Sequence, residues 1–146
     1  MHGLGNDFVV LDERRGRLGL NADRARAIAD RKRGVGCDQI IAIEPSERAD
    51  AFMRIRNADG GEVEACGNGA RCVAALLLRE GGKTEVSIDT NAGIVRARRT
   101  ADGNISVDMG EPRFDWRDIP LARAADTLHV DCRIGPLADG VAVLAH

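Results

Sequence analysis

The stretch that decides the fold is residues 57–72, which read NADGGEVEACGNGARC and lead directly into VAALLL at 73–78. The first four residues are typical of a turn, and the six residues after Cys72 are apolar at every position. A helix that is apolar all round is buried in the interior of a domain. We therefore expect a loop that carries the thiol of Cys66 at the beginning of a buried helix.

The loop between this thiol and the helix has the features of an anion site. The first backbone N–H groups of a helix have no acceptors within the helix, and the helix dipole is positive at that end. Glycine at 67 and 69 lets the backbone come close to a ligand. Such a site favours a thiolate at Cys66 and could hold a carboxylate, which suits proton transfer at the carbon next to that carboxylate. The alternative is a buried structural cysteine beside an ordinary glycine turn.

Composition narrows the class of protein. A chain of 146 residues can form one domain with a real core, and with 3% aromatic residues that core must consist mostly of Ala, Val, Leu and Ile. The net charge of -2 gives no electrostatic reason to bind nucleic acid. No apolar run approaches the ~20 residues that span a bilayer, and the first residues lack a signal-peptide pattern. We expect a cytoplasmic protein with no membrane partner.

The cysteines and histidines do not form a metal-binding pattern. Cys37, Cys66, Cys72 and Cys132 include no C-x-x-C pair, and the three histidines do not complete a zinc-ligand spacing. A disulfide framework is not expected in a chain without an export signal. We therefore expect no metal site.

The flanking segments predict a mixture of helices and strands. Residues 1–7 are predicted as a loop that leads into a strand at 8–11, and residues 21–31 as a helix capped by Asn21. Further strands are predicted at 40–43, 51–57, 84–90, 93–100 and 104–110, of which the last three form a meander, and the helix after Cys66 is predicted to run to about residue 80. The proline-containing segment 111–120 is typical of a linker, and strands are predicted at 127–134 and 141–144.

The block CGNGARC at 66–72, together with NADG at 57–60, resembles the motifs of the diaminopimelate epimerases. Three more blocks agree with that family in the same order, namely MHGLGNDF at 1–8, GCDQ at 36–39 and MGEP at 109–112. The resemblance covers nearly the whole chain and is strongest over residues 1–112.

The resemblance implies an α+β fold in which a mixed, largely antiparallel sheet curls around a central buried helix. In the family, two such halves enclose the active site. Residues 1–112 then correspond to the first half-domain, 113–126 to a linker and 127–146 to the opening strands of an incomplete second half. The family's second cysteine loop and its Glu-Arg pair have no counterpart here, because Cys132 lacks the following glycine loop.

The resemblance also implies roles for individual residues. Cys66 matches one of two catalytic thiols, Gly67 and Asn68 match the loop that grips the α-carboxylate, and Asn6, Gln39 and Asn57 match positions that hold the amino acid's polar groups. The family interconverts LL- and meso-diaminopimelate, in lysine and peptidoglycan precursor synthesis. One thiolate removes the α-proton while the other thiol protonates the opposite face. Neither pyridoxal phosphate nor a metal takes part, so we expect a small-molecule amino-acid substrate and no cofactor.

Two alternatives remain open. The chain could be a half-domain that binds weakly or only folds, since a second cysteine loop is absent. It could also belong to the related cysteine racemases that act on proline-like substrates, although the GLGNDF and NADG blocks argue against this. An uncovered half-domain should expose an apolar patch and open strand edges, so we expect a homodimer or another association through that face.

Overall fold

The computed structural model describes residues 1–119, 121 and 123–129. Met1–Gly110 is the compact unit that carries the helices and strands. In chain order these are β1 (His2–Gly3), β2 (Asn6–Asp12), α1 (Ala22–Ala29), β3 (Gln39–Glu44), β4 (Ala51–Asn57), β5 (Glu62–Val63), α2 (Gly67–Gly81), β6 (Glu85–Thr90), β7 (Gly93–Arg99) and β8 (Ile105–Asp108).

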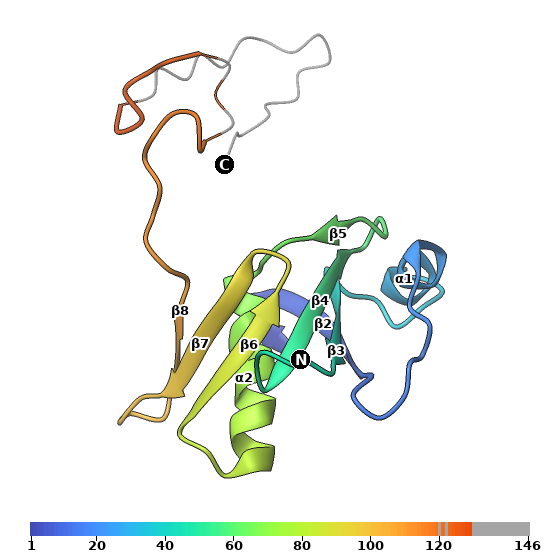
Figure 1. Cartoon of the computed structure of the whole chain (residues 1–146). Coiled ribbons are helices and arrows are strands. Elements are labelled where there is room, and N and C mark those ends of the chain that lie inside the picture. Colours follow the sequence, from blue (N-terminus) through green and yellow to red (C-terminus); the bar gives the residue numbers. More distant parts are fainter. Residues whose placement is uncertain (120, 122, 130–146) are drawn as a thin grey trace, which may run out of the picture. The chain divides into compact units, whose positions relative to one another are not determined.

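The strands of this unit form one mixed sheet (Figure 1). Their order is β1-β2-β3-β4-β6-β7-β8, and β5 pairs with β4 beside this path. The pairs β2–β3 and β4–β6 are parallel, and the other pairs are antiparallel. The predicted mixed, largely antiparallel sheet and the predicted meander of β6, β7 and β8 are therefore confirmed.

Helix α2 packs on one face of the sheet. Strand β4 explains why this face is apolar, because Ala51, Met53 and Ile55 are buried and alternate with more exposed neighbours. The main core joins such strand residues to the buried residues Ala70, Cys72, Val73, Ala74, Leu77 and Leu78 of α2. Burying each large aliphatic side chain contributes roughly 1.5–3 kcal/mol. The helix contacts both β1 and β8, which are the two ends of the strand order, so the sheet curls toward it.

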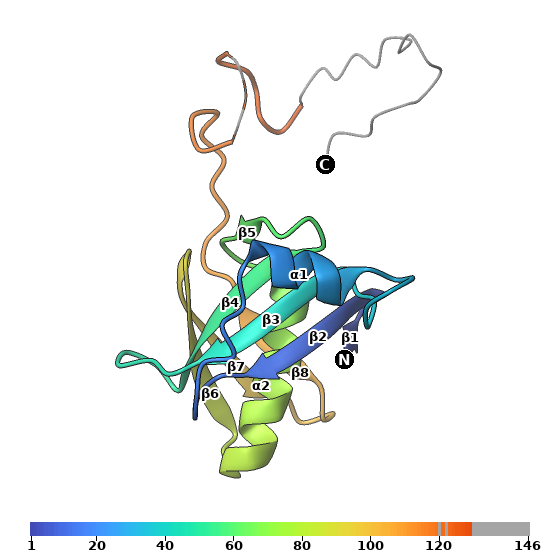
Figure 2. The ribbon, with the colours of Figure 1, turned by 90° about the vertical axis from the view of Figure 1, so that its right-hand side faces the viewer.

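Helix α1 packs on the opposite face, as Figure 2 shows for β2, β3 and β4 between the two helices. Ala25 and Ala29 of α1 form a second, smaller core with Cys37 and Ile40. The predicted N-cap is confirmed, since the Asn21 side chain accepts a hydrogen bond from the Arg24 N–H at 2.9 Å.

The structure corrects two predictions and adds one strand. Residues 1–7 are not only loop, because His2–Gly3 forms β1, which pairs with β2 around a turn where Leu4 and Gly5 have positive φ. The short strand β5 was not predicted. In the predicted strand at 127–134, residues 127–129 form a turn and bend, because nothing pairs with them among the described residues. The remainder of that strand and the one predicted at 141–144 lie outside the described residues.

Candidate active site at the beginning of helix α2

Cys66 lies at the beginning of the buried helix, as the sequence predicts, but it is the N-cap of α2 itself, because residues 67–69 form the first helical turn and not the predicted loop. Its backbone is extended, and its Sγ accepts a hydrogen bond from the Gly69 N–H at 3.4 Å. A Cβ at position 69 would lie 3.0 Å from Ile41 Cδ1, so this first turn packs closely against β3. The thiol is half-buried. No acidic side chain occupies the first turn of α2, so the positive end of the helix dipole is not neutralised there.

Asn68 joins the cysteine loop to the N-terminal strands. Its Nδ2 donates a hydrogen bond to Asn6 Oδ1 at 3.3 Å, and its Oδ1 accepts one from the Arg71 guanidinium. A Cβ at Gly3 would lie 3.2 Å from the Asn68 carbonyl oxygen, so β1 packs directly on the first turn of α2. Asn6 and Asn68, which are 62 residues apart, are thus held together.

Gln39 and Asn57 form a second amide pair. They face each other across β3 and β4, and Gln39 Nε2 donates a hydrogen bond to Asn57 Oδ1 at 2.8 Å. The other end of the Gln39 amide, Oε1, is buried and has no hydrogen-bond partner among the described residues. A buried acceptor without a partner costs free energy, so this oxygen is a candidate ligand contact.

Both amide pairs lie on the face of the sheet that α2 covers. Side chains two residues apart in a strand lie on the same face of the sheet. Gln39 therefore shares a face with Ile41, which packs against Gly69 of α2. Its partner Asn57 shares that face with Ile55 of β4. Strands β2 and β3 begin, and β4 ends, near these amides. The structure therefore joins Asn6 to Asn68 and Gln39 to Asn57, and it places Asn6, Gln39 and Asn57 on the face of the sheet that carries the first turn of α2 with Cys66, Gly67 and Asn68.

Two neighbours of the site were not assigned a role from the sequence. The Arg71 guanidinium donates a hydrogen bond to the Asn68 side chain. Side chains three residues apart on a helix are neighbours, so the spacing of Asn68 and Arg71 could have predicted this contact from the sequence. Met109, which is 52% exposed, has its Sδ 3.6 Å from where a Cβ of Gly67 would lie. Its approach depends on the whole β6–β8 meander, so no local signal predicts it.

Cys72 lies further along α2 and has structural surroundings. It is 6% exposed, and its Sγ donates a hydrogen bond to the His2 carbonyl oxygen at 3.5 Å. Burial raises the pKa of the Cys72 thiol. Cys72 therefore fits a packing role between α2 and β1.

The described residues contain neither a metal-binding cluster nor a membrane-spanning helix. In that part of the chain, no group of three or more His, Cys, Asp and Glu side chains is arranged to hold a metal ion. No helix there has both the length and the apolar composition needed to cross a bilayer.

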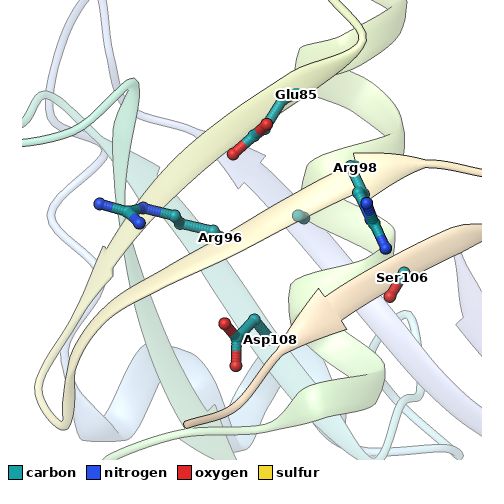
Figure 3. Close-up of a pocket in the computed structure, with 6 residues that line it drawn as sticks. Glu85, Arg96, Arg98, Ser106 and Asp108 are labelled. Carbon is teal, nitrogen blue, oxygen red and sulfur yellow. The ribbon is translucent and has the colours of Figure 1, made fainter.

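A separate hollow of ≈ 500 Å³ lies on the outer side of β6, β7 and β8 (Figure 3). It is lined by Glu85, Arg96, Ala97, Arg98, Ser106 and Asp108. Arg96 and Arg98 alternate with the buried Val95 and Ala97, so they point away from the face that packs on α2. The hollow shares no residue with the six gathered around Cys66, and we do not include it in the candidate site.

Comparison with known proteins identifies the family of this chain. A family model described as diaminopimelate epimerase matches residues 1–115. Proteins named diaminopimelate epimerase are 57% identical over 98% of this chain in Rhodospirillum centenum, and 62% identical over 87% of it in Rhizorhabdus wittichii. This chain spans 50% and 44% of those proteins, or about half their length.

Among solved structures, a phenazine biosynthesis protein of the PhzF family from Bacillus anthracis aligns with a TM-score of 0.51. It is 29% identical, and the alignment covers 73% of this chain and 35% of that one. The likeness supports the mixed sheet with its two helices. Since the family model covers well over half of the chain and the relatives are more than half identical, the chain belongs to the diaminopimelate epimerase family.

Proposed function

We propose that this chain supplies the first half of an active site that epimerises an α-carbon of diaminopimelate between the LL and meso forms. Cys66 is one of the two thiols that exchange the proton. The observation that carries the proposal is the Cys66 thiol at the N-cap of α2, next to the free N–H groups of the first helical turn. The names of the relatives support the substrate, and with it a place in lysine and peptidoglycan precursor synthesis.

The α-carboxylate binds at the beginning of α2 in this proposal. The N–H groups of Gly67 and Asn68 have no acceptors within the helix and point along the positive end of its dipole. Fixed donors at this place stabilise the negative charge that moves onto the carboxylate when the α-proton leaves. Gly67 leaves room for the substrate because it has no side chain.

The Cys66 thiolate then removes the α-proton. The α-carbon–hydrogen bond breaks, its electron pair moves toward the carboxylate, and an S–H bond forms at Cys66. A second thiol delivers a proton to the opposite face of the carbon, which inverts the centre. Cys37 and Cys72 do not fit that second role, because both are buried in packing positions. In this proposal the second half of the family's fold provides it.

The amides of Asn6, Gln39 and Asn57 bind the substrate's other polar groups. An amide can both donate and accept hydrogen bonds, so a set of amides suits a molecule with ammonium and carboxylate groups. Gln39 Oε1 in particular needs a donor, and a substrate ammonium group supplies one. These assignments account for the otherwise costly burial of an acceptor without a partner.

The organisation of the chain is part of the proposal. Residues 1–112 form the half-domain with α2 as its central helix, 113–126 form the linker, and 127–146 begin the second half. We also propose a homodimer or an association through the face that a second half would cover. Light scattering should then give a mass above that of one chain, and a monodisperse monomer contradicts this part of the proposal.

The test is α-proton exchange in D₂O. The chain is incubated with LL-diaminopimelate, and the loss of the α-hydrogen signal is followed by NMR. Cys66→Ala should abolish exchange, whereas Cys72→Ala, a matched control on the same helix, should retain it as long as far-UV circular dichroism shows a folded chain. Exchange that persists in Cys66→Ala, or its absence in the unmodified chain, contradicts the proposed role of this half site.

A further inference from the structure

Asp38 is not one of the proposed substrate contacts, yet it is connected to the neighbours of three of them. Its carboxylate oxygen Oδ2 accepts a hydrogen bond from the Asp7 N–H at 2.8 Å, and its own N–H donates to the Asp7 carbonyl oxygen at 3.0 Å. Its carbonyl oxygen accepts a hydrogen bond from the Ala58 N–H at 3.1 Å. Asp7 follows Asn6, Ala58 follows Asn57, and Gln39 follows Asp38 itself.

Arg31 holds the second oxygen of this carboxylate. Its guanidinium donates to Asp38 Oδ1 at 2.9 Å and to Asp7 Oδ2 at 3.1 Å. The loop after α1 is folded tightly to allow this, because Gly36 has a φ of 82° and a Cβ there would lie 3.1 Å from Arg31 Cα. Both carboxylate oxygens of Asp38 are therefore used, one by the β2 backbone and one by Arg31.

This cluster contributes little to stability. The side chains of Arg31, Asp7 and Asp38 are 56%, 50% and 44% exposed, and ion pairs at such exposure are weakened by solvent. The cluster matters more for the placement of the strands, because it joins the beginnings of β2 and β3 to the end of β4. A site made of amides on three strands works only when the strands hold those amides within about 0.5 Å of the productive geometry.

We propose that Asp38, held by Arg31, is a positioning residue that fixes Asn6, Gln39 and Asn57 relative to one another for substrate binding. The part of this inference that concerns substrate rests on the proposed function. Asp38 does not touch the reacting atoms. Its carboxylate binds the backbone next to Asn6, and this fixes the Asp38 backbone, which precedes Gln39 and binds the Ala58 N–H next to Asn57.

The chemistry of the cluster explains why a carboxylate is needed. Both partners of the Asp38 carboxylate, the Asp7 N–H and the Arg31 guanidinium, are donors. An asparagine at 38 has one acceptor oxygen, and its NH₂ group would face one of those donors. Asp38→Asn therefore breaks one connection while keeping the size of the side chain.

Asp12→Asn is the matched control. Asp12 ends the same strand, β2, and its carboxylate also binds an arginine side chain and a backbone N–H, both from Arg14. The two substitutions thus remove similar exposed interactions at opposite ends of one strand. Arg31→Lys preserves the charge, and Arg31→Ala is a second disrupting variant should Asp38→Asn fail to fold.

The first readout does not depend on activity. The ¹⁵N heteronuclear NOE of the side-chain amides is measured for Asn6, Gln39 and Asn57 in the whole chain. We expect lower NOE values for these amides in Asp38→Asn and in Arg31→Ala, and unchanged values in Asp12→Asn and Arg31→Lys. Unchanged values in Asp38→Asn and Arg31→Ala, or an equal loss in Asp12→Asn, overturn the proposal.

The second readout is α-proton exchange on LL-diaminopimelate in D₂O. Misplacement of binding groups by about 1 Å can cost 100-fold, so we expect Asp38→Asn to slow exchange by roughly 10- to 100-fold. Asp12→Asn should exchange at the unmodified rate, and Arg31→Lys should retain most of it. Exchange at the unmodified rate in Asp38→Asn overturns the proposal. If the unmodified chain does not exchange, the proposed function fails and the NOE alone decides the positioning role.

Discussion

Replacing Gly60 by alanine should destabilise the fold more than the same replacement at Gly103. The two glycines have nearly equal φ values of 84° and 86°. A Cβ at Gly60 would lie 2.5 Å from the Ala22 carbonyl oxygen and 3.0 Å from Ala22 Cα, at the beginning of α1. A Cβ at Gly103 would meet nothing within 4 Å. The pair therefore separates backbone strain from steric overlap.

The expected magnitudes follow from these contacts. A left-handed conformation costs an L-residue roughly 1–2 kcal/mol, and this cost applies to both variants. The overlap at Gly60 is with backbone atoms, which cannot rotate away, and forcing extra atoms into a packed site costs a further 1–3 kcal/mol, approximately. We expect Gly103→Ala to lose about 1–2 kcal/mol of unfolding free energy, and Gly60→Ala to lose about 2–5 kcal/mol.

Urea denaturation followed by far-UV circular dichroism measures this difference. With a slope of about 1–3 kcal/mol per molar urea, an extra loss of 2 kcal/mol lowers the midpoint by roughly 1 M. Equal midpoints for the two variants would refute the reasoning, because they would mean that the turn at 57–60 does not press against α1. The result also bears on the candidate site, since this turn begins with Asn57.

Three further predictions concern the helix caps, the pH dependence and the thiols. Asn21→Ala should lower the unfolding free energy by about 1 kcal/mol in urea titrations because α1 loses its cap, whereas Asn21→Asp should not. The side-chain hydrogen bond from Arg14 lowers the pKa of Asp12 from 3.8 to about 2, so its stabilising effect is present above pH 4 and is lost as the pH falls toward 2. Asp12→Asn should remove that part of the pH dependence of the thermal midpoint, and an unchanged pH profile would contradict it. In the folded chain, iodoacetamide should alkylate half-buried Cys66 faster than Cys72, whose thiol is buried and has a raised pKa, and peptide mass spectrometry should show this order. Equal alkylation rates for Cys66 and Cys72 would contradict this prediction, because they would mean that the two thiols have similar surroundings.

The sequence predicts those features that depend on neighbouring residues. Helix α2 ends where Gly82 takes a left-handed conformation, and the sequence predicts this end to within a residue or two, whereas the helix begins at Gly67, inside the segment 67–69 that was expected to be a loop. The alternation at 51–57 likewise predicts β4 and its buried face, because side-chain direction in a strand repeats every two residues.

Features that depend on distant segments were not predicted. Strand β1 has only two residues, so no periodicity could distinguish it from a loop, and its pairing with β2 is stabilised by the packing of Gly3 on α2. The hydrogen bond between Gln39 and Asn57 depends on the register of β3 against β4, which no single segment encodes. The sequence provides the residue types of the candidate site, whereas the sheet determines which of them face each other.

Strand direction explains why blocks so far apart in the sequence meet. Strands β2 and β3 are parallel and begin near Asn6 and Gln39, and the antiparallel β4 ends at Asn57 on the same side. Strand β6 is parallel to β4, β7 is antiparallel to β6, and β8 is antiparallel to β7. Strand β8 therefore runs in the same direction as β4, and Met109, which follows it, reaches Gly67. A slip of one residue between β3 and β4 would turn one amide of the pair to the opposite face. The register of β3 against β4 therefore determines the site as much as the residues that line it.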